Sequence, residues 1–255
     1  MGWYYTKHTK DDSAIVSKIE TVLLEYPYYG YRRVTKEIAN KNTIINKKKI
    51  YRIMKESNLL CSKKKKAFIP KTTDSNHSLL IYPNEIAPLS PLQPCEIWVA
   101  DITYVWTGNG FVYVAIVLDQ VSRKVVGWSI GTHMHRQLCI DALEMALLKH
   151  RPPTYHHSDR GVQYCSHDYI NLLKKHNITS SMAAVGVSVD NPFAESFNRT
   201  LKVEEVYLHA YESFEEARDS IAEFIMVYNE KRLHSSLGYI PPVEFEARYY
   251  QSINN

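Results

Sequence analysis

The spacing of hydrophobic residues differs between the front of the chain and the rest. Within residues 13–27 apolar side chains recur every three or four positions, which predicts a helix that ends at Pro27. The same spacing predicts a second helix after Gly30 and a third within residues 45–60, with Asn46 as its N-cap. Two short helices joined by a tight turn, the second strongly basic, form a helix-turn-helix pattern. We therefore expect a small helical domain over residues 1–68.

The next segment, residues 69–95, has little periodicity and is rich in proline. Its five prolines are Pro70, Pro83, Pro88, Pro91 and Pro94. Proline has no amide hydrogen and breaks regular structure, so this composition predicts an extended linker and a domain boundary.

Beyond the linker the pattern changes to strands and helices. Residues 97–106 and 111–119 predict a hairpin, and the second run is almost entirely apolar, as in a strand buried on both faces. The later elements are expected as a strand at 124–130, a helix at 136–150, a strand at 153–159, a helix at 166–177, a strand at 178–184 and two further helices. This order predicts an α/β fold of the ribonuclease-H-like kind, a five-stranded mixed sheet flanked by helices. We assign it to residues 96–210, followed by a helical extension over 211–255.

Charge is distributed unevenly along the 255 residues. Residues 1–73 carry 17 Lys and Arg against six Asp and Glu, whereas the remainder carries 14 against 21. A basic front indicates a polyanionic partner such as nucleic acid, and the acidic excess behind it must be tolerated near that partner or neutralised by a metal. The lysine run at 63–66 is equally consistent with a solvated surface. The candidate DNA contacts here are Lys47, Lys48, Lys49, Arg52, Lys63, Lys64, Lys65 and Lys66.

The cysteines and the apolar runs exclude other classes of protein. Four scattered cysteines without a C-x-x-C pair argue against a disulfide framework and a cysteine zinc site. The longest apolar run, residues 111–118, is far shorter than the roughly 20 residues of a membrane-spanning helix. We expect free thiols, no membrane segment and a cytoplasmic location.

Two aspartates stand at unusual positions in the predicted sheet. Asp101 lies in mid-strand on the same face as Val99 and Thr103, where an unpaired carboxylate is costly to bury. Asp159 ends the fourth strand, which in this strand order is expected to lie beside the first. Two carboxylates at close range resist ionisation, and a divalent cation removes that repulsion.

A third carboxylate, Glu195, falls near the start of a helix. Asn191 is the expected N-cap and Pro192 the first helical residue. Helical spacing places Glu195, Arg199 and Lys202 on one face. The opposite, apolar face is expected to comprise Phe193, Phe197, Leu201 and Leu208. Arg199 and Lys202 are candidate DNA contacts, with simple solvation as the alternative.

Four segments together resemble a known family. They are "WVADITYVW", "HHSDRGVQY", "DNPFAESFNRTLKVE" and "YNEKRLHSSLGYIPPVEFE", with 35 residues between Asp159 and Glu195. In this order and spacing the chain resembles the Asp-Asp-Glu transposases and retroviral integrases. It is most similar to the second-reading-frame product of the insertion-sequence-three family, over nearly its whole length.

The resemblance implies a chemistry and a set of partners. Asp101, Asp159 and Glu195 would be the catalytic residues and would hold two Mg²⁺ ions, with Mn²⁺ as an alternative. Two such ions serve in-line phosphoryl displacement, so one site could cleave DNA and then join it. The partners would be the terminal inverted repeats of the element, target DNA, further copies of the chain, and the upstream-frame product or a frameshift fusion with it.

Other functions and roles stay open at this point. The chain could be a catalytically silent protein that binds DNA ends, or a ribonuclease-H-like nuclease. Asp119 and Asp190 are interpreted as turn residues, and His156, His157 and His167 as hydrogen-bonding or DNA-contacting residues rather than metal ligands. For the C-terminal Tyr228, Asn229, Arg232 and His234, a structural role is at least as plausible as a functional one.

Overall fold

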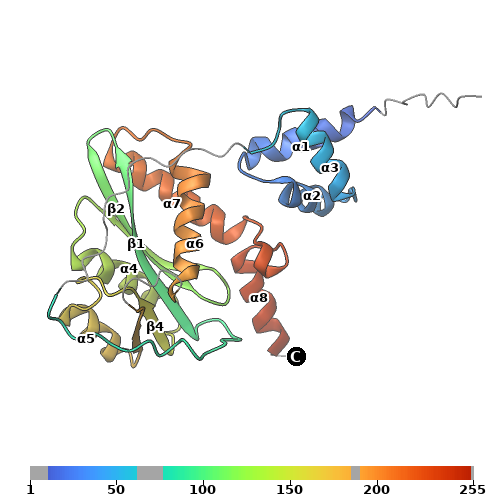
Figure 1. Ribbon diagram of the computed structural model, residues 1–255. Coiled ribbons are helices and arrows are strands. Elements are labelled where there is room, and N and C mark those ends of the chain that lie inside the picture. The colour runs from blue at the N-terminus through green and yellow to red at the C-terminus, as the bar shows by residue number, and fades with distance from the viewer. Residues whose placement is uncertain (1–10, 62–76, 185–189, 254–255) are drawn as a thin grey trace, which may run out of the picture. The chain divides into compact units, whose positions relative to one another are not determined.

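The computed structural model describes residues 11–61, 77–184 and 190–253. The chain divides into two compact units, Met1–Lys65 and Lys66–Asn255. The first unit contains the helices α1 (Ser13–Glu25), α2 (Tyr31–Asn40) and α3 (Lys47–Glu56) (Figure 1).

The three helices of the first unit form where the apolar spacing predicts them. At the start of α3 the Asn46 side chain accepts a hydrogen bond from the Lys48 amide at 2.9 Å, which confirms the predicted N-cap. Apolar residues from all three helices fill a common core, and each such burial stabilises the unit by about 1.5–3 kcal/mol. They are Ile19, Val22, Val34, Ile38, Ile50, Ile53 and Met54.

The second unit is built on one mixed sheet with the strand order β3-β2-β1-β4-β5. Its strands are β1 (Ile97–Thr107), β2 (Gly110–Asp119), β3 (Val125–Gly131), β4 (Tyr155–Ser158) and β5 (Thr179–Met182). The first three pair antiparallel, while β4 runs parallel to β1 and β5 parallel to β4. This arrangement confirms the predicted five-stranded sheet and the neighbouring first and fourth strands.

Helices cover both faces of the sheet, as Figure 1 shows. The helices α4 (Arg136–Lys149) and α5 (His167–Lys175) pack on the face formed by Trp98, Ala100 and Ile102. The helices α6 (Pro192–Leu201) and α7 (Phe214–Glu230) pack on the opposite face, where Val99 and Val105 lie. Alternate residues of β1 thus enter two separate cores, as the period of two along a strand requires.

A π-helical turn, η2 (Lys202–Val206), follows α6 directly. Its wider winding changes the phase of the helix, so positions after Leu201 no longer follow the spacing of α6. The prediction that Leu208 continues the apolar face is wrong, because its side chain is 42% exposed. The turn instead buries Glu204, which receives two hydrogen bonds of 2.6 Å from the buried Arg232.

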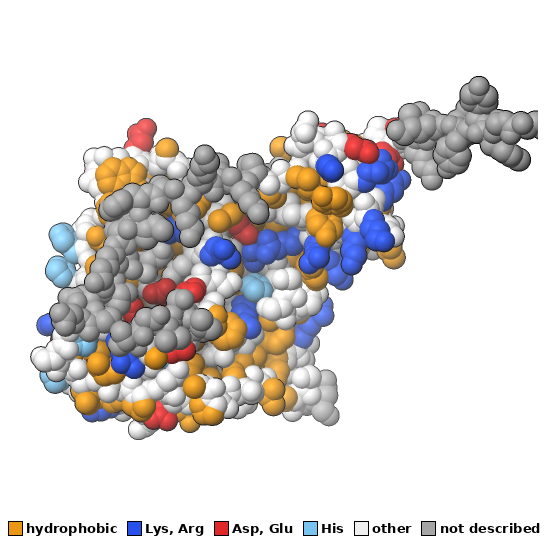
Figure 2. Space-filling model, in the orientation of Figure 1, with side chains coloured by type: hydrophobic (Ala, Val, Ile, Leu, Met, Phe, Trp, Pro, Cys, Tyr) orange, Lys and Arg blue, Asp and Glu red, His pale blue; other side chains and the backbone are white. Residues whose placement is uncertain are grey.

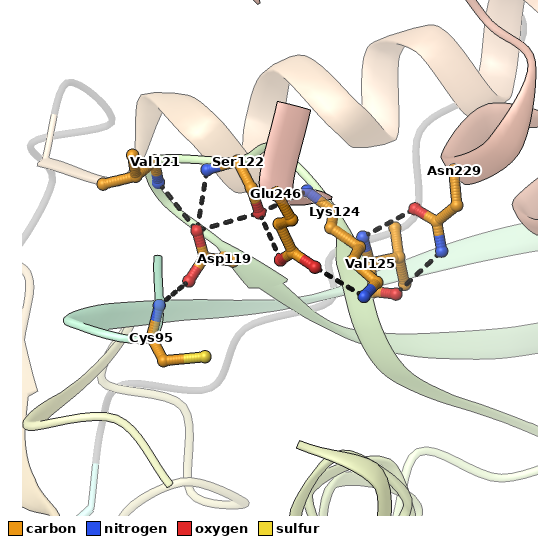
Figure 3. A network of polar contacts seen from close by, with 8 residues as sticks. All are labelled: Cys95, Asp119, Val121, Ser122, Lys124, Val125, Asn229 and Glu246. Carbon is orange, nitrogen blue, oxygen red and sulfur yellow. Dashed lines mark hydrogen bonds and ion pairs between the residues drawn. The ribbon is translucent and has the colours of Figure 1, made fainter. Parts of the chain in front are cut away.

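The C-terminal segment is fastened to the turn between β2 and β3 (Figure 3). Asn229 of α7 exchanges two hydrogen bonds of 2.9 Å with the backbone of Val125. In α8 (Pro242–Ile253), Glu246 pairs with Lys124 at 2.6 Å and accepts a hydrogen bond from Ser122 at 2.9 Å. Together with the Glu204 pair, these contacts give Asn229 and Arg232 structural roles.

Residues 77–95, the described part of the predicted linker, contain no helix or strand but lie against the sheet. The Met182 amide donates to Pro83 O at 3.2 Å, and the Glu85 amide donates to Ser181 Oγ at 2.9 Å. Within the described ranges, none of the helices combines the length and apolar character that crossing a bilayer requires.

Candidate active site

Asp101 lies partly buried on β1, at the start of the stretch that extends beyond β4. Its Oδ1 accepts a hydrogen bond from the Ile102 amide, and its Oδ2 accepts one from Asn198 Nδ2, both at 2.8 Å. Burial and, after it, the charge of Asp159 together raise the pKa of Asp101 to about 7. Near neutral pH the Asp101 carboxyl is therefore partly protonated, whereas an ordinary surface carboxylate is fully ionised.

Asp159 follows the last residue of β4. Since β1 and β4 are parallel and Val99 pairs with His157, two further residues along each strand bring Asp159 level with Asp101. The Gly161 amide donates to Asp159 Oδ1 at 2.9 Å and orients the carboxylate. The structure therefore brings these two predicted site residues together.

The turn after Asp159 depends on a glycine and a buried glutamine. A Cβ atom on Gly161 would lie 3.0 Å from both Asp159 Oδ1 and Gln163 Oε1, closer than side chains tolerate without movement. Gln163 is buried and donates to Met134 O at 3.0 Å, which fixes the turn against the start of α4. This contact gives Gln163 a structural role in the turn after Asp159 that the sequence did not reveal.

Glu195 lies on the exposed side of α6, in its first turn. Pro192 occupies the first helical position as predicted, but Asn191 makes no cap hydrogen bond. Asn191 occupies the predicted N-cap position, but its Nδ2 donates to Ala100 O on β1 at 2.9 Å and not to the helix. The side-chain amide of Asn191 thus binds a backbone carbonyl of β1 and leaves the first amides of α6 uncapped.

That carbonyl belongs to an edge of β1 that β4 leaves open. The strand β4 pairs with β1 only over Ile97–Val99, so the later part of this edge has no strand of the described ranges beside it, and α6 lies next to β1 (Figure 1). Lys202 Nζ donates to Tyr104 O and lies 3.6 Å from the centre of the Tyr104 ring. Arg199 remains exposed, whereas burial lowers the pKa of Lys202 to about 8.

The chemistry of the donors suits a hard divalent cation. Two carboxylates repel each other across neighbouring strands, and carboxylate oxygens are the ligands that Mg²⁺ prefers. The charge of Glu195 also contributes to the raised pKa of Asp101. Among residues 11–61, 77–184 and 190–253, however, no three His, Cys, Asp or Glu side chains are close enough together to hold a metal ion.

The other acids and histidines have ordinary partners. Asp119 accepts hydrogen bonds from the amides of Cys95, Val121 and Ser122 and from the Ser122 hydroxyl, as Figure 3 shows. Asp190 accepts from the Ala184 amide at 2.7 Å. The structure thus supports the interpretation of both acids as turn residues.

Two of the three histidines are buried in the sheet. His156 contacts the Tyr169 hydroxyl and His157 the Ser181 hydroxyl, each at 2.9 Å. Burial lowers the pKa of His156 to about 3 and that of His157 to about 4, so both are neutral. His167, at the start of α5, is exposed.

The candidate DNA contacts of the first unit fall into two groups. Lys47 and Lys48 are exposed on α3. Lys49 and Arg52 pair with Asp12 at 2.8 and 2.6 Å, and Arg52 also pairs with Glu56 at 2.7 Å. Lys63, Lys64, Lys65 and Lys66 lie outside the described residues.

One residue that contacts a predicted site residue, Asn198, was not predicted from the sequence. It lies one turn after Glu195 and is buried, with its amide directed at Asp101. The available signal was its i+3 spacing from Glu195, which places the two side chains close together on the helix.

Comparison with known proteins agrees with both units. The "Integrase core domain" family matches residues 91–188, a second family of the same description matches 176–242, and the "HTH-like domain" family matches 10–67. The transposase for insertion sequence element IS629 of Shigella sonnei is 33% identical over 246 residues, 96% of this chain and 82% of that protein. The transposase InsF for insertion sequence IS3A of Escherichia coli is 37% identical over 222 residues, 86% of this chain and 76% of that protein. The chain belongs to the insertion-sequence-three family of transposases.

Membership of this transposase family confirms the resemblance found in the four segments and makes the chain a polynucleotidyl transferase. An uncharacterized 31 kDa protein of insertion element IS600 from Shigella sonnei is 39% identical over 227 residues, 88% of this chain and 83% of that protein. A simian T-cell lymphotropic virus intasome solved by cryo-EM gives a TM-score of 0.51 at 16% identity, covering 85% of this chain and 70% of that chain. This last likeness confirms the integrase-like fold of the transposase.

Proposed function

We propose that this transposase binds the ends of its own element and cuts and joins DNA there, with Asp101, Asp159 and Glu195 as the ligands of two Mg²⁺ ions. The observation that carries the proposal is the position of Asp101 and Asp159 on adjacent parallel strands, where burial first and then the charge of Asp159 raise the pKa of Asp101 to about 7. Two carboxylates that repel each other add nothing to stability, so the arrangement is best explained by a cation that binds both.

Each residue near the acids has a part in the proposed reaction. Asn198 and the Gly161 amide orient Asp101 and Asp159, and Glu195 approaches from α6. Ions held by these carboxylates would help to activate the attacking oxygen and to stabilise the leaving oxygen of an in-line displacement. Arg199, exposed one turn after Glu195, contacts a backbone phosphate, and Lys202 adds positive charge beside Tyr104.

The first unit supplies the attraction to DNA in this proposal. Lys47 and Lys48 project from α3 and contact phosphates of the terminal inverted repeats. Two ends must be held together for joining, so the active form is a homo-oligomer on DNA that also engages target DNA. It works in the cytoplasm, alone or with the upstream-frame product as a separate chain or a frameshift fusion.

Strand transfer is the experiment that tests the proposal. The purified full chain is incubated with Mg²⁺ and a labelled duplex that carries the element's end, beside the Asp159→Asn variant. Joined product from the wild type alone supports both the activity and the role of Asp159. Joining by Asp159→Asn would refute the ligand assignment. Specific binding without joining would indicate a silent end-binding protein, and cutting of RNA–DNA hybrids without joining would indicate a nuclease.

A further inference from the structure

The end of the β1–β2 hairpin carries three aromatic side chains, Tyr104, Trp106 and Phe111, which we call the aromatic ledge. The Phe111 ring lies 4.8 Å from the Trp106 ring and 5.7 Å from the Tyr104 ring, edge to face in both pairs. Trp106 is 59% exposed, and Figure 2 shows hydrophobic side chains gathered at this end of the hairpin, toward the upper left. A large exposed aromatic residue on a strand is an aggregation liability unless it has a use.

The aromatic ledge is held rigidly by its surroundings. At the tip of the hairpin, the Gly108 amide donates to Tyr211 O at 2.8 Å and Asn109 Nδ2 donates to Glu212 O at 3.4 Å. On the other side, Lys202 Nζ covers the Tyr104 ring at 3.6 Å. A surface fixed in this way loses little conformational entropy when a ligand stacks on it.

The position of the aromatic ledge links it to the catalytic acids. Trp106 follows Asp101 by five residues on β1, a distance of about 17 Å along the strand. Tyr104 and Trp106 point to the opposite face of the sheet from Asp101, and Lys202 reaches around the open edge of β1 that separates the two faces. Lys202 therefore contacts the aromatic ledge from the helix pair that packs on the face of Asp101.

The two sides of the aromatic ledge carry opposite charge. Lys202, with Arg199 one turn before it, makes the side facing α6 positive. Beyond the tip, Glu216 accepts a hydrogen bond from the Glu212 amide at 2.7 Å, so acids occupy the far side. A polyanion would be attracted along the α6 side and repelled at the tip.

We propose that the aromatic ledge stacks unpaired bases of the DNA strand that leaves the catalytic acids, while Lys202 and Arg199 neutralise its phosphates. Aromatic platforms beside cations bind single-stranded nucleic acid with little sequence preference, because every base offers a π face. The inference rests on the proposed function, which places DNA at Asp101. It adds that the transposase holds the strand in a melted state beyond the acids.

Binding of overhang DNA tests the inference without any cutting. A duplex with a five-nucleotide single-stranded overhang that contains 2-aminopurine is titrated with the full chain in EDTA, and a blunt duplex serves as the second substrate. Trp106→Ala should weaken overhang binding about tenfold and restore 2-aminopurine fluorescence, while blunt-duplex binding changes less than about twofold. Trp106→Phe should bind like the wild type, and Leu148→Ala, an exposed residue of α4, is the matched control.

The outcomes separate this inference from the proposed function. Wild-type strand transfer together with unchanged overhang binding by Trp106→Ala would overturn the aromatic ledge and leave the catalytic proposal intact. If overhang binding depends on Trp106 but the wild type does not join DNA, the role of the aromatic ledge is supported and the catalytic proposal is overturned. A change in oligomeric state on sedimentation, without a change in overhang binding, would assign the ledge to contact between copies and also overturn the inference.

A second measurement keeps the test valid if Trp106→Ala does not fold. Overhang DNA should quench the intrinsic tryptophan fluorescence of the wild type, and that quenching should disappear in the conservative Trp106→Phe variant. Quenching that persists in Trp106→Phe would overturn the inference.

Discussion

Two acids on neighbouring strands of one sheet, the half-buried Asp101 on β1 and the buried Asp119 on β2, differ in what surrounds them. Burial raises the pKa of both. Asp119 is fully buried and accepts hydrogen bonds from three backbone amides and a hydroxyl. Asp101 accepts one amide and one side-chain hydrogen bond, and its nearest charged neighbour is another carboxylate.

The difference shows how a structural carboxylate is distinguished from a reactive one. An ionised carboxylate offers about four acceptor positions, and those of Asp119 are occupied by three backbone amides and by a Ser122 hydroxyl whose hydrogen is shared with Glu246. Among the described residues only two donors contact the Asp101 carboxylate, so some of its acceptor positions are unused. The charge that acts on it most strongly is that of Asp159. A buried acid that is saturated with donors stabilises the fold, whereas one that is left half-satisfied beside a second acid is suited to hold a metal.

The largest effect should come from Asp101→Asn. We expect strand transfer to fall at least about a thousandfold, because the stabilisation given by bound metal ions is worth several kcal/mol. The measurement is the single-turnover rate of joining with Mg²⁺. The variant should unfold at the same temperature as the wild type or higher, since one of two repelling charges is gone. A rate within tenfold of the wild type would remove Asp101 from the catalytic set.

Asp119→Ala should lower the stability of the fold without acting directly on the joining reaction. Removing the acceptor leaves several buried donors unsatisfied, so we expect the free energy of unfolding to drop by about 3 kcal/mol. Urea unfolding measures this change, and Asp119→Asn, which keeps one acceptor oxygen, should lose less. If Asp119→Ala were as stable as the wild type but could not join DNA, the contrast between the two acids would fail.

Asn198→Ala should have a smaller effect that appears in the metal dependence. Residues that orient metal ligands typically change affinity or activity by about 10- to 100-fold, and Asn198 orients Asp101. The Mg²⁺ concentration for half-maximal joining should rise by that factor, with partial rescue at high Mg²⁺. Ser196→Ala, an exposed neighbour on α6, is the control. An unchanged Mg²⁺ dependence would show that Asn198 serves packing only.

The smallest effect concerns pH in the absence of metal. The pKa of Asp101 is about 7 in the folded chain against an ordinary value of 3.8, so the native state keeps a proton that the unfolded state has lost. Stability from this group is present below pH 3.8 and is lost as pH rises through 7. Between pH 5 and 8 in EDTA, the wild type should lose about 2 kcal/mol more than Asp101→Asn. The free energy of unfolding is measured with urea at each pH. If it fell equally for both proteins between pH 5 and 8, the raised pKa of Asp101 would be contradicted.

Local patterns in the sequence were enough to predict the paired acids. Strand order alone placed Asp159 beside Asp101, and the position of Asp119 in a turn after a buried strand indicated its structural role. Both inferences depend on short-range periodicity and on rules of sheet topology, which act strongly where a core is buried.

Contacts between distant segments could not be predicted in the same way. Helical spacing placed Lys202 beside Arg199 and Leu208 beside Leu201, but the π-helical turn changes the phase after α6. Asn191 carries the signal of an N-cap and yet binds Ala100, 91 residues earlier. The partner of such a side chain depends on which buried polar group lacks a hydrogen bond in the folded chain. A single sequence does not reveal which group that is.

The fastening of the C-terminal segment has a consequence for the timing of synthesis. Ser122 and Glu246 are separated by 124 residues, and Val125 and Asn229 by 104. A ribosome releases the strands that carry Asp101 and Asp159 well before it releases the residues that lock the β2–β3 turn. We expect the nascent chain to complete its sheet late, so that the ability to cut DNA arises only once α7 and α8 have emerged.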